Sequence, residues 1–267
     1  IARHGGCCLA YWCKRSWRGR LGSLAICQCR ARHPCRLFHP VLRHDFGSYC
    51  ARWAQMIPLV FVHGFMGGSA QWDGQVAALA GVPVIALDLP GYGKNAHLEA
   101  CRDIVDFAHW ALDELERQNV ARFHLLGHSM GGMIAQEMAA LAPDRIVRLV
   151  LYGTGGQGIL PGRFETIETS KSRVATDGVR NTARRIAATW FLDCEQAPGF
   201  EACAAIAQMA GKQSLLAGLD AMNRWDGEAR LHDIIAQTLV IWGDRDRTYP
   251  WPQVQKLWQA IPNTSLA

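Results

Sequence analysis

The stretch from Phe123 to Ala135 places a serine between a short apolar run and a helix-like segment, and it constrains the fold more than any other part of the chain. Its centre, residues 127–131, has the pattern Gly-x-Ser-x-Gly. A serine at the apex of so sharp a turn has strained backbone, and side chains two residues to either side would collide there. Gly127 and Gly131 carry no Cβ atoms that could collide. The pattern therefore predicts a strand, a tight turn and a helix.

Continuous apolar runs recur along the chain and predict strands that are buried on both faces. They cover residues 58–62, 82–87, 123–126, 146–151 and 238–242. Helical periodicity separates several of them, at 99–118, 130–142 and 250–260. This alternation predicts an α/β fold with a mostly parallel sheet, right-handed crossovers and helices on both faces. Residues 264–267 resemble the start of one more strand, and we expect the sheet to be incomplete at both ends.

The alternation stops at residue 153 and resumes at about residue 231. Between these points no run predicts a strand, and the spacing of apolar residues predicts helices over 175–192, 199–210 and 214–225. We therefore predict an α/β core formed by residues 56–152 and 231–267, with residues 153–230 inserted as a helical cap.

Residues 1–55 differ in composition from the rest of the chain. They hold nine arginines and one lysine against one acidic residue, and seven of the ten cysteines. They show neither the apolar core of a secretion signal nor paired Cys-x-x-Cys ligands for zinc. We expect a disordered or non-native leader, with a targeting peptide or a metal-binding module as alternatives.

The remaining residues carry a small net negative charge and only three cysteines. These features predict a protein of a reducing compartment, the cytoplasm, with no nucleic-acid partner. No run of 18 or more apolar residues is present, so no membrane span is expected. The oligomeric state stays open.

A serine hydroxyl becomes a useful nucleophile only with a base, an acid that orients the base, and donors for the developing oxyanion. The turn after the first strand, at His63-Gly64-Phe65, offers the backbone N–H of Phe65 as one donor, and Met130 offers a second. Two acids follow the strand at 238–242. Asp244 is suited to closing the turn, so we predict that Asp246 is the catalytic acid.

Four motifs stand in the order typical of one family: the His63 turn, residues 88–93, the Gly127–Gly131 turn and residues 243–246. With them the chain resembles the α/β-hydrolase fold family over residues 57–267. The resemblance implies that Ser129 is the nucleophile, Asp246 the acid, and Phe65 and Met130 the oxyanion donors.

The same resemblance implies a small-molecule substrate, an ester or lactone of a small organic acid, cleaved through an acyl-enzyme. No phosphate loop, dinucleotide fingerprint or metal-ligand spacing is present, so we expect neither a cofactor nor a metal. A carbon–carbon bond hydrolase, a perhydrolase, a lyase-type relative or a non-catalytic scaffold of the same fold are the alternatives.

The chain departs from the family pattern at the histidine that should follow the acid. Only 21 residues follow Asp246, and none of them is histidine. Of the ten histidines, His232 is the least unsuitable substitute. We expect that the sequence stops before the catalytic histidine and that catalysis by this chain is impaired.

Overall fold

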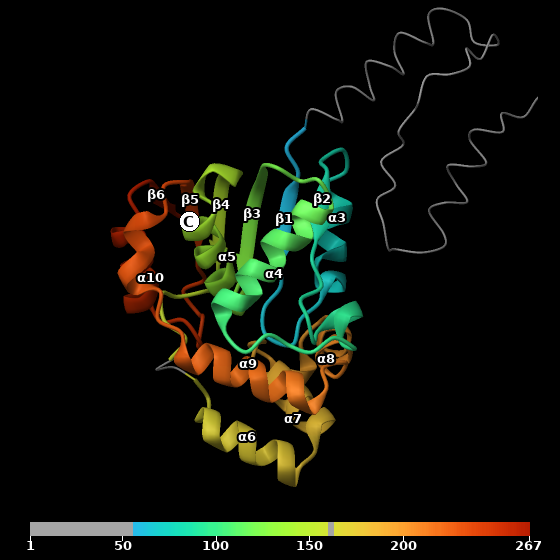
Figure 1. The fold of residues 1–267 in the computed structure, drawn as a ribbon. Coiled ribbons are helices and arrows are strands. Elements are labelled where there is room, and N and C mark those ends of the chain that lie inside the picture. Colours follow the sequence, from blue (N-terminus) through green and yellow to red (C-terminus); the bar gives the residue numbers. More distant parts are fainter. Residues whose placement is uncertain (1–55, 160–162) are drawn as a thin grey trace, which may run out of the picture. The chain divides into compact units, whose positions relative to one another are not determined.

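The computed structural model describes residues 56–159 and 163–267, so the predicted leader at 1–55 lies outside the described residues. The described residues form a parallel sheet with the strand order β2-β1-β3-β4-β5-β6 (Figure 1). The strands are β1 (Leu59–Val62), β2 (Val84–Ala86), β3 (Phe123–His128), β4 (Ile146–Tyr152), β5 (Gln237–Ile241) and β6 (Thr264–Leu266). The prediction of a parallel α/β fold is confirmed, and the segment at 264–266 is indeed a strand.

The order of the strands determines where a ligand can bind. From β1 the chain first moves outward to β2, and then returns to place β3 on the other side of β1. Loops that leave adjacent strands in opposite directions open a crevice at the carboxyl ends of those strands. Val62 pairs with Gly127, so the loops that follow β1 and β3 start side by side.

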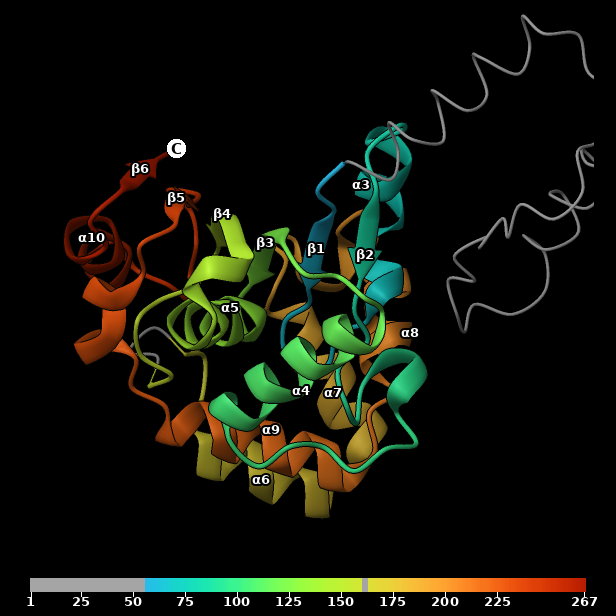
Figure 2. The ribbon, with the colours of Figure 1, turned by 45° about the horizontal axis from the view of Figure 1, so that its top comes forward.

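Helices α4 (Ile104–Arg117) and α5 (Met130–Leu141) pack against each other on one face of the sheet (Figures 1 and 2). The buried residues of α4 recur at intervals of one, three or four, as expected for one apolar face on a helix. They are Ile104, Phe107, Ala108, Ala111, Leu112 and Leu115. Helix α5 is buried along most of its length, which fixes the position of the turn that precedes it.

Between β4 and β5, the described residues form four α-helices: α6 (Ile167–Thr176), α7 (Val179–Ala188), α8 (Phe200–Ala207) and α9 (Lys212–Arg224). We call this segment, residues 153–230, the helical insertion. Its helices lie beyond the carboxyl ends of β1 and β3 (Figure 1). The prediction of one helix over 175–192 is wrong: Gly178, with φ 81°, separates α6 from α7.

The remaining helices are short or peripheral. They are α3 (Asp73–Ala78), α10 (Trp251–Ala260) and the 3₁₀ turns η1 (Ser69–Trp72), η2 (Gly93–Asn95), η3 (Pro143–Arg145), η4 (Cys194–Gln196) and η5 (Glu228–Asp233). Among the described residues, no helix is long and apolar enough to cross a membrane.

Candidate active site

Ser129 lies at the turn between β3 and α5, as the sequence pattern predicts. Its backbone has φ 55° and ψ −121°, a conformation that non-glycine residues rarely adopt. Hydrogen bonds hold the turn: Ser129 N–H donates to the Tyr152 carbonyl at 3.1 Å, and the Ser129 carbonyl accepts from Gly132 N–H at 2.8 Å and from Thr154 Oγ1 at 2.9 Å. Strain of this kind persists because the surrounding structure holds it in place.

The two glycines of the motif are explained by close backbone approach. A Cβ atom on Gly127 would lie 2.2 Å from the carbonyl oxygen of Gly131. A Cβ atom on Gly131 would lie 2.3 Å from the carbonyl oxygen of Val62, at the end of β1. Both distances are far shorter than van der Waals contact, so α5 packs this closely against β1 and β3 only because both residues lack a side chain.

The predicted oxyanion donors lie on the two sides of Ser129. Phe65 follows β1 and lines the same cavity as Ser129. Met130 is the first residue of α5, where backbone N–H groups have no partner within the helix. Within residues 56–159 and 163–267, neither N–H donates to a protein acceptor. Two unused N–H groups beside a serine hydroxyl are suited to bind an oxyanion.

His63 supports the turn that carries Phe65 and does not reach Ser129. Its ring is fully buried, with Nδ1 donating to the Gly64 carbonyl at 2.8 Å and Nε2 accepting from Leu89 N–H at 3.0 Å. Burial lowers the pKa of His63 to about 4, although the Gly64 carbonyl and Asp88 act in the opposite direction. The ring is therefore neutral at pH 7 and joins the β1 loop to the β2 loop.

This burial predicts a pH-dependent loss of stability. The unfolded chain protonates His63 near pH 6.5, whereas the folded chain keeps it neutral down to about pH 4, so stability is complete above pH 6.5 and falls as the pH is lowered. Between pH 6.5 and 5 we expect His63 to contribute a loss of about 1.5 kcal/mol. Urea unfolding at several pH values measures this loss of stability. His63→Gln should flatten the profile and His109→Gln, at an exposed position, should not; equal slopes in both variants would contradict the assignment.

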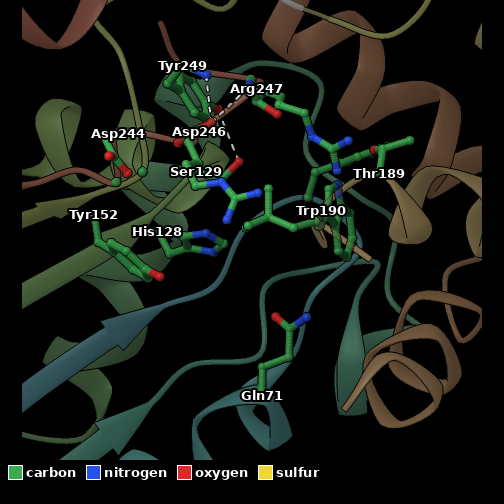
Figure 3. A pocket seen from close by; sticks show the side chains of 17 residues that line it. Gln71, His128, Ser129, Tyr152, Thr189, Trp190, Asp244, Asp246, Arg247 and Tyr249 are labelled. Atoms are coloured by element: carbon green, nitrogen blue, oxygen red, sulfur yellow. Dashed lines mark hydrogen bonds between the residues drawn. The ribbon is translucent and has the colours of Figure 1, made fainter. Parts of the chain in front are cut away.

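Asp246 lies in the loop between β5 and α10, where its carboxylate organises the backbone. Its Oδ1 accepts hydrogen bonds from Thr248 N–H at 2.8 Å and Tyr249 N–H at 3.0 Å. Together with Ser129 and Phe65, Asp246 lines one cavity (Figure 3). Asp244, the alternative acid, is exposed and lines the same cavity.

Tyr249 was not among the residues predicted for the site. Its hydroxyl lies 3.1 Å from Ser129 Oγ, close enough for a hydrogen bond in which either oxygen donates. Burial of the ring raises the pKa of Tyr249, so the phenol is protonated at neutral pH. No motif in the sequence indicates this contact; the position three residues after Asp246 was the only available signal.

None of the histidines in the described part of the chain hydrogen-bonds to Ser129 Oγ, including His232, which pairs with Asp233 at 3.2 Å on the surface. His128 is the histidine nearest in sequence and lines the cavity. Its ring packs against Tyr152, with centroids 5.0 Å apart. Burial lowers the pKa of His128 to about 4, with Asp246 opposing this shift, so His128 is also neutral at pH 7.

The cavity beside Ser129 has a volume of about 440 Å³, which falls in the range of small-molecule sites. The helical insertion contributes Gly153, Thr189, Trp190 and Leu192 to its wall, and the core contributes the remainder. In Figure 3 the labelled side chains surround Ser129, with Tyr249 above it and Gln71 below. As far as the described residues extend, no group of three or more His, Cys, Asp and Glu side chains is placed to hold a metal ion.

Comparison with known proteins agrees with this architecture. The model of the alpha/beta hydrolase fold family matches residues 57–266. The chain therefore belongs to the α/β-hydrolase fold family, and the prediction of an enzyme of this class is confirmed.

Two curated relatives and one solved structure illustrate the similarity. The dihydrolipoyllysine-residue acetyltransferase component of the acetoin cleaving system of Pseudomonas putida is 31% identical, and the match covers 79% of this chain and 59% of that protein. The chain thus spans about three-fifths of that relative's length. The 2-hydroxy-6-oxononadienedioate/2-hydroxy-6-oxononatrienedioate hydrolase of Burkholderia vietnamiensis is 28% identical, with 78% and 77% covered. A bromoperoxidase from Bacillus anthracis is 27% identical with a TM-score of 0.72, and the match covers 80% of this chain and 83% of that one.

Proposed function

We propose that the chain carries the nucleophilic site of a serine hydrolase that acts on an ester or lactone of a small organic acid. The observation that carries this proposal is the strained backbone of Ser129 beside a cavity, since a serine with no chemical role has no need of φ 55°. The free N–H groups of Phe65 and Met130 and the carboxylate of Asp246 support it. We further propose that residues 153–230 act as a cap that shapes the substrate site.

In the proposed reaction Ser129 Oγ attacks the carbonyl carbon of the substrate and transfers its proton to a base. The carbonyl oxygen becomes an oxyanion and accepts hydrogen bonds from the N–H groups of Phe65 and Met130. Collapse of the tetrahedral intermediate breaks the carbon–oxygen bond, and the leaving alkoxide takes the proton from the base. Water then hydrolyses the acyl-enzyme by the same steps in reverse order, which regenerates Ser129.

The base of this scheme is not assigned to a residue, because no described histidine contacts Ser129 Oγ. Asp246 is proposed to orient that base. Loss of one member of a catalytic triad lowers turnover by about four to six orders of magnitude. We therefore propose that Ser129 reacts slowly wherever such a base is absent, and that the oxyanion donors then provide the remaining activity.

Labelling with a fluorophosphonate probe tests the nucleophile. The chain is expected to be labelled, and Ser129→Ala is expected to remove the label completely. Added imidazole supplies a soluble base of suitable pKa, so it should raise the labelling rate of the unaltered chain by about tenfold.

A matched control separates this site from a serine outside the cavity. Ser69→Ala removes a hydroxyl that donates to Asp88 at 2.7 Å, outside the cavity, and should leave the labelling unchanged. Labelling that persists in Ser129→Ala would exclude Ser129 as the nucleophile. If imidazole left the labelling rate unchanged, proton transfer from Ser129 to a base would not be the step that limits the reaction.

A further inference from the structure

The cavity beside Ser129 has an uneven distribution of charge. All of its charged side chains belong to the loop between β5 and α10: Asp244, Arg245, Asp246 and Arg247. The Asp246 carboxylate already accepts two backbone hydrogen bonds, from Thr248 and Tyr249. Of the carboxylates in residues 56–159 and 163–267, none lies within 4.0 Å of either arginine. The cavity therefore contains two cations that have no ion-pair partner in the described part of the protein.

Arg247 is held in place at the boundary between the core and the helical insertion. Its Nη2 donates to the Phe191 carbonyl at 2.5 Å. In Figure 3 its side chain extends from the loop toward Thr189 and Trp190, which belong to the same segment as Phe191. One N–H of the guanidinium is used by this contact, and the planar group has four more.

Of the two acidic side chains of the cavity, Asp246 is engaged by backbone N–H groups, and Asp244 lies on the other side of the site. Asp244 lies beside Tyr152 in Figure 3, with Ser129 between it and Arg247. Thr189 Oγ1 donates to the Ile186 carbonyl at 2.6 Å, so its proton is not available to a ligand. The charged hydrogen-bond donor on the Arg247 side is the guanidinium, a group whose geometry matches a carboxylate.

We propose that Arg247 binds a carboxylate of the substrate, with Arg245 as the second cation of the cavity. The inference rests on the proposed function and specifies its substrate class: an acid that keeps one carboxylate free while its ester or lactone carbonyl reaches Ser129. Arg247 is then a specificity-determining residue, and its contact with Phe191 holds the guanidinium toward the cavity.

Binding of glutarate to the full chain tests this proposal independently of catalysis. Glutarate carries two carboxylates, and its diamide, glutaramide, has nearly the same shape without the charges. Isothermal titration calorimetry at low ionic strength should show glutarate binding at least about tenfold more tightly than glutaramide, since charge-assisted hydrogen bonds exceed neutral ones in strength. Raised salt should weaken glutarate binding only.

Variants locate the contact. Arg247→Gln is expected to weaken glutarate binding about tenfold or more, and Arg247→Lys, which keeps the charge but loses the planar fork, is expected to have an intermediate effect. Arg122→Gln is the matched control, because Arg122 is exposed and precedes the amino end of β3, whereas Ser129 follows its carboxyl end. Thermal unfolding of each variant checks that the fold is retained, and Arg245→Gln provides a second test if Arg247→Gln unfolds.

Two results would overturn the proposal: equal affinity for glutarate and glutaramide, or equal losses in Arg247→Gln and Arg122→Gln. The second result would reduce Arg247 to a structural link between the core and the insertion. If Ser129 is not labelled but glutarate still binds, only the proposed hydrolase chemistry is excluded. If Ser129 is labelled but glutarate does not bind, only the proposed carboxylate site is excluded.

Discussion

Gly131→Ala is expected to lower the free energy of unfolding by about 3 kcal/mol or more, and to abolish the reactivity of Ser129. The added methyl group would lie 2.3 Å from the Val62 carbonyl oxygen and 2.5 Å from that of His63. Both obstacles are backbone atoms at the end of β1, so no side-chain rotation relieves the clash. Helix α5 must move away from β1, and this movement separates the N–H of Met130 from that of Phe65.

The measurement combines chemical denaturation with fluorophosphonate labelling. Gly74→Ala is the matched control, because a Cβ atom on Gly74, within α3, meets no atom within 4 Å. There alanine should be neutral or stabilising by up to about 1 kcal/mol, since glycine is the poorer helix former. If Gly131→Ala unfolded and reacted like Gly74→Ala, close packing of α5 against β1 would not be the reason for the glycine.

The Gly131 clash also shows why so much of the core could be predicted. An apolar run that ends in a glycine-containing turn is compatible with few backbone conformations. The strand β3, the turn and the helix α5 therefore agree with the prediction. The segment at 264–266 could be predicted on a different ground: it follows a helix that ends at Ala260 after a connection of only three residues. Local residue patterns of this kind restrict the backbone conformation, so they can be recognised from the sequence alone.

The helical insertion was predicted less well, because its helices are specified by packing more than by local pattern. Helix α6 was not predicted; only Ile167, Ser170 and Val174 are buried along it, too few for a clear apolar periodicity. Its start is determined by Thr166, whose side chain accepts a hydrogen bond from Thr169 N–H at 3.1 Å. Such a cap is a signal that could have been used.

The candidate site likewise contains some residues that the sequence predicts and others that it does not. Ser129, Phe65 and Asp246 follow three different strands, and their presence in one cavity follows from the parallel sheet. Their catalytic roles stay predictions. Tyr249 and Arg247 could not be predicted, because their contacts with Ser129 and with Phe191 depend on how the loop after β5 folds and on where the insertion packs.

Glu137→Ala is expected to destabilise the protein by about 3 kcal/mol, because it breaks a buried link between α5 and the end of the insertion. The side chain is 4% exposed; its Oε1 accepts from Trp225 Nε1 at 2.8 Å and its Oε2 from Arg230 Nη1 at 2.5 Å. Without the carboxylate, the indole N–H is left buried with no partner and the guanidinium loses its counterion. Arg230 is 41% exposed and regains some hydration, which limits the cost.

Denaturant unfolding measures this loss, and Asp220→Ala provides the comparison. Asp220 pairs with Lys171 at 2.7 Å, but both side chains are more than one-third exposed, so its removal should cost less than about 1 kcal/mol. Because Glu137 lies on the helix that follows Ser129, the same substitution should loosen the insertion over the cavity. Glutarate affinity should therefore fall in Glu137→Ala and stay unchanged in Asp220→Ala. Equal and small effects in both variants would mean that the insertion is held over Ser129 by apolar packing alone.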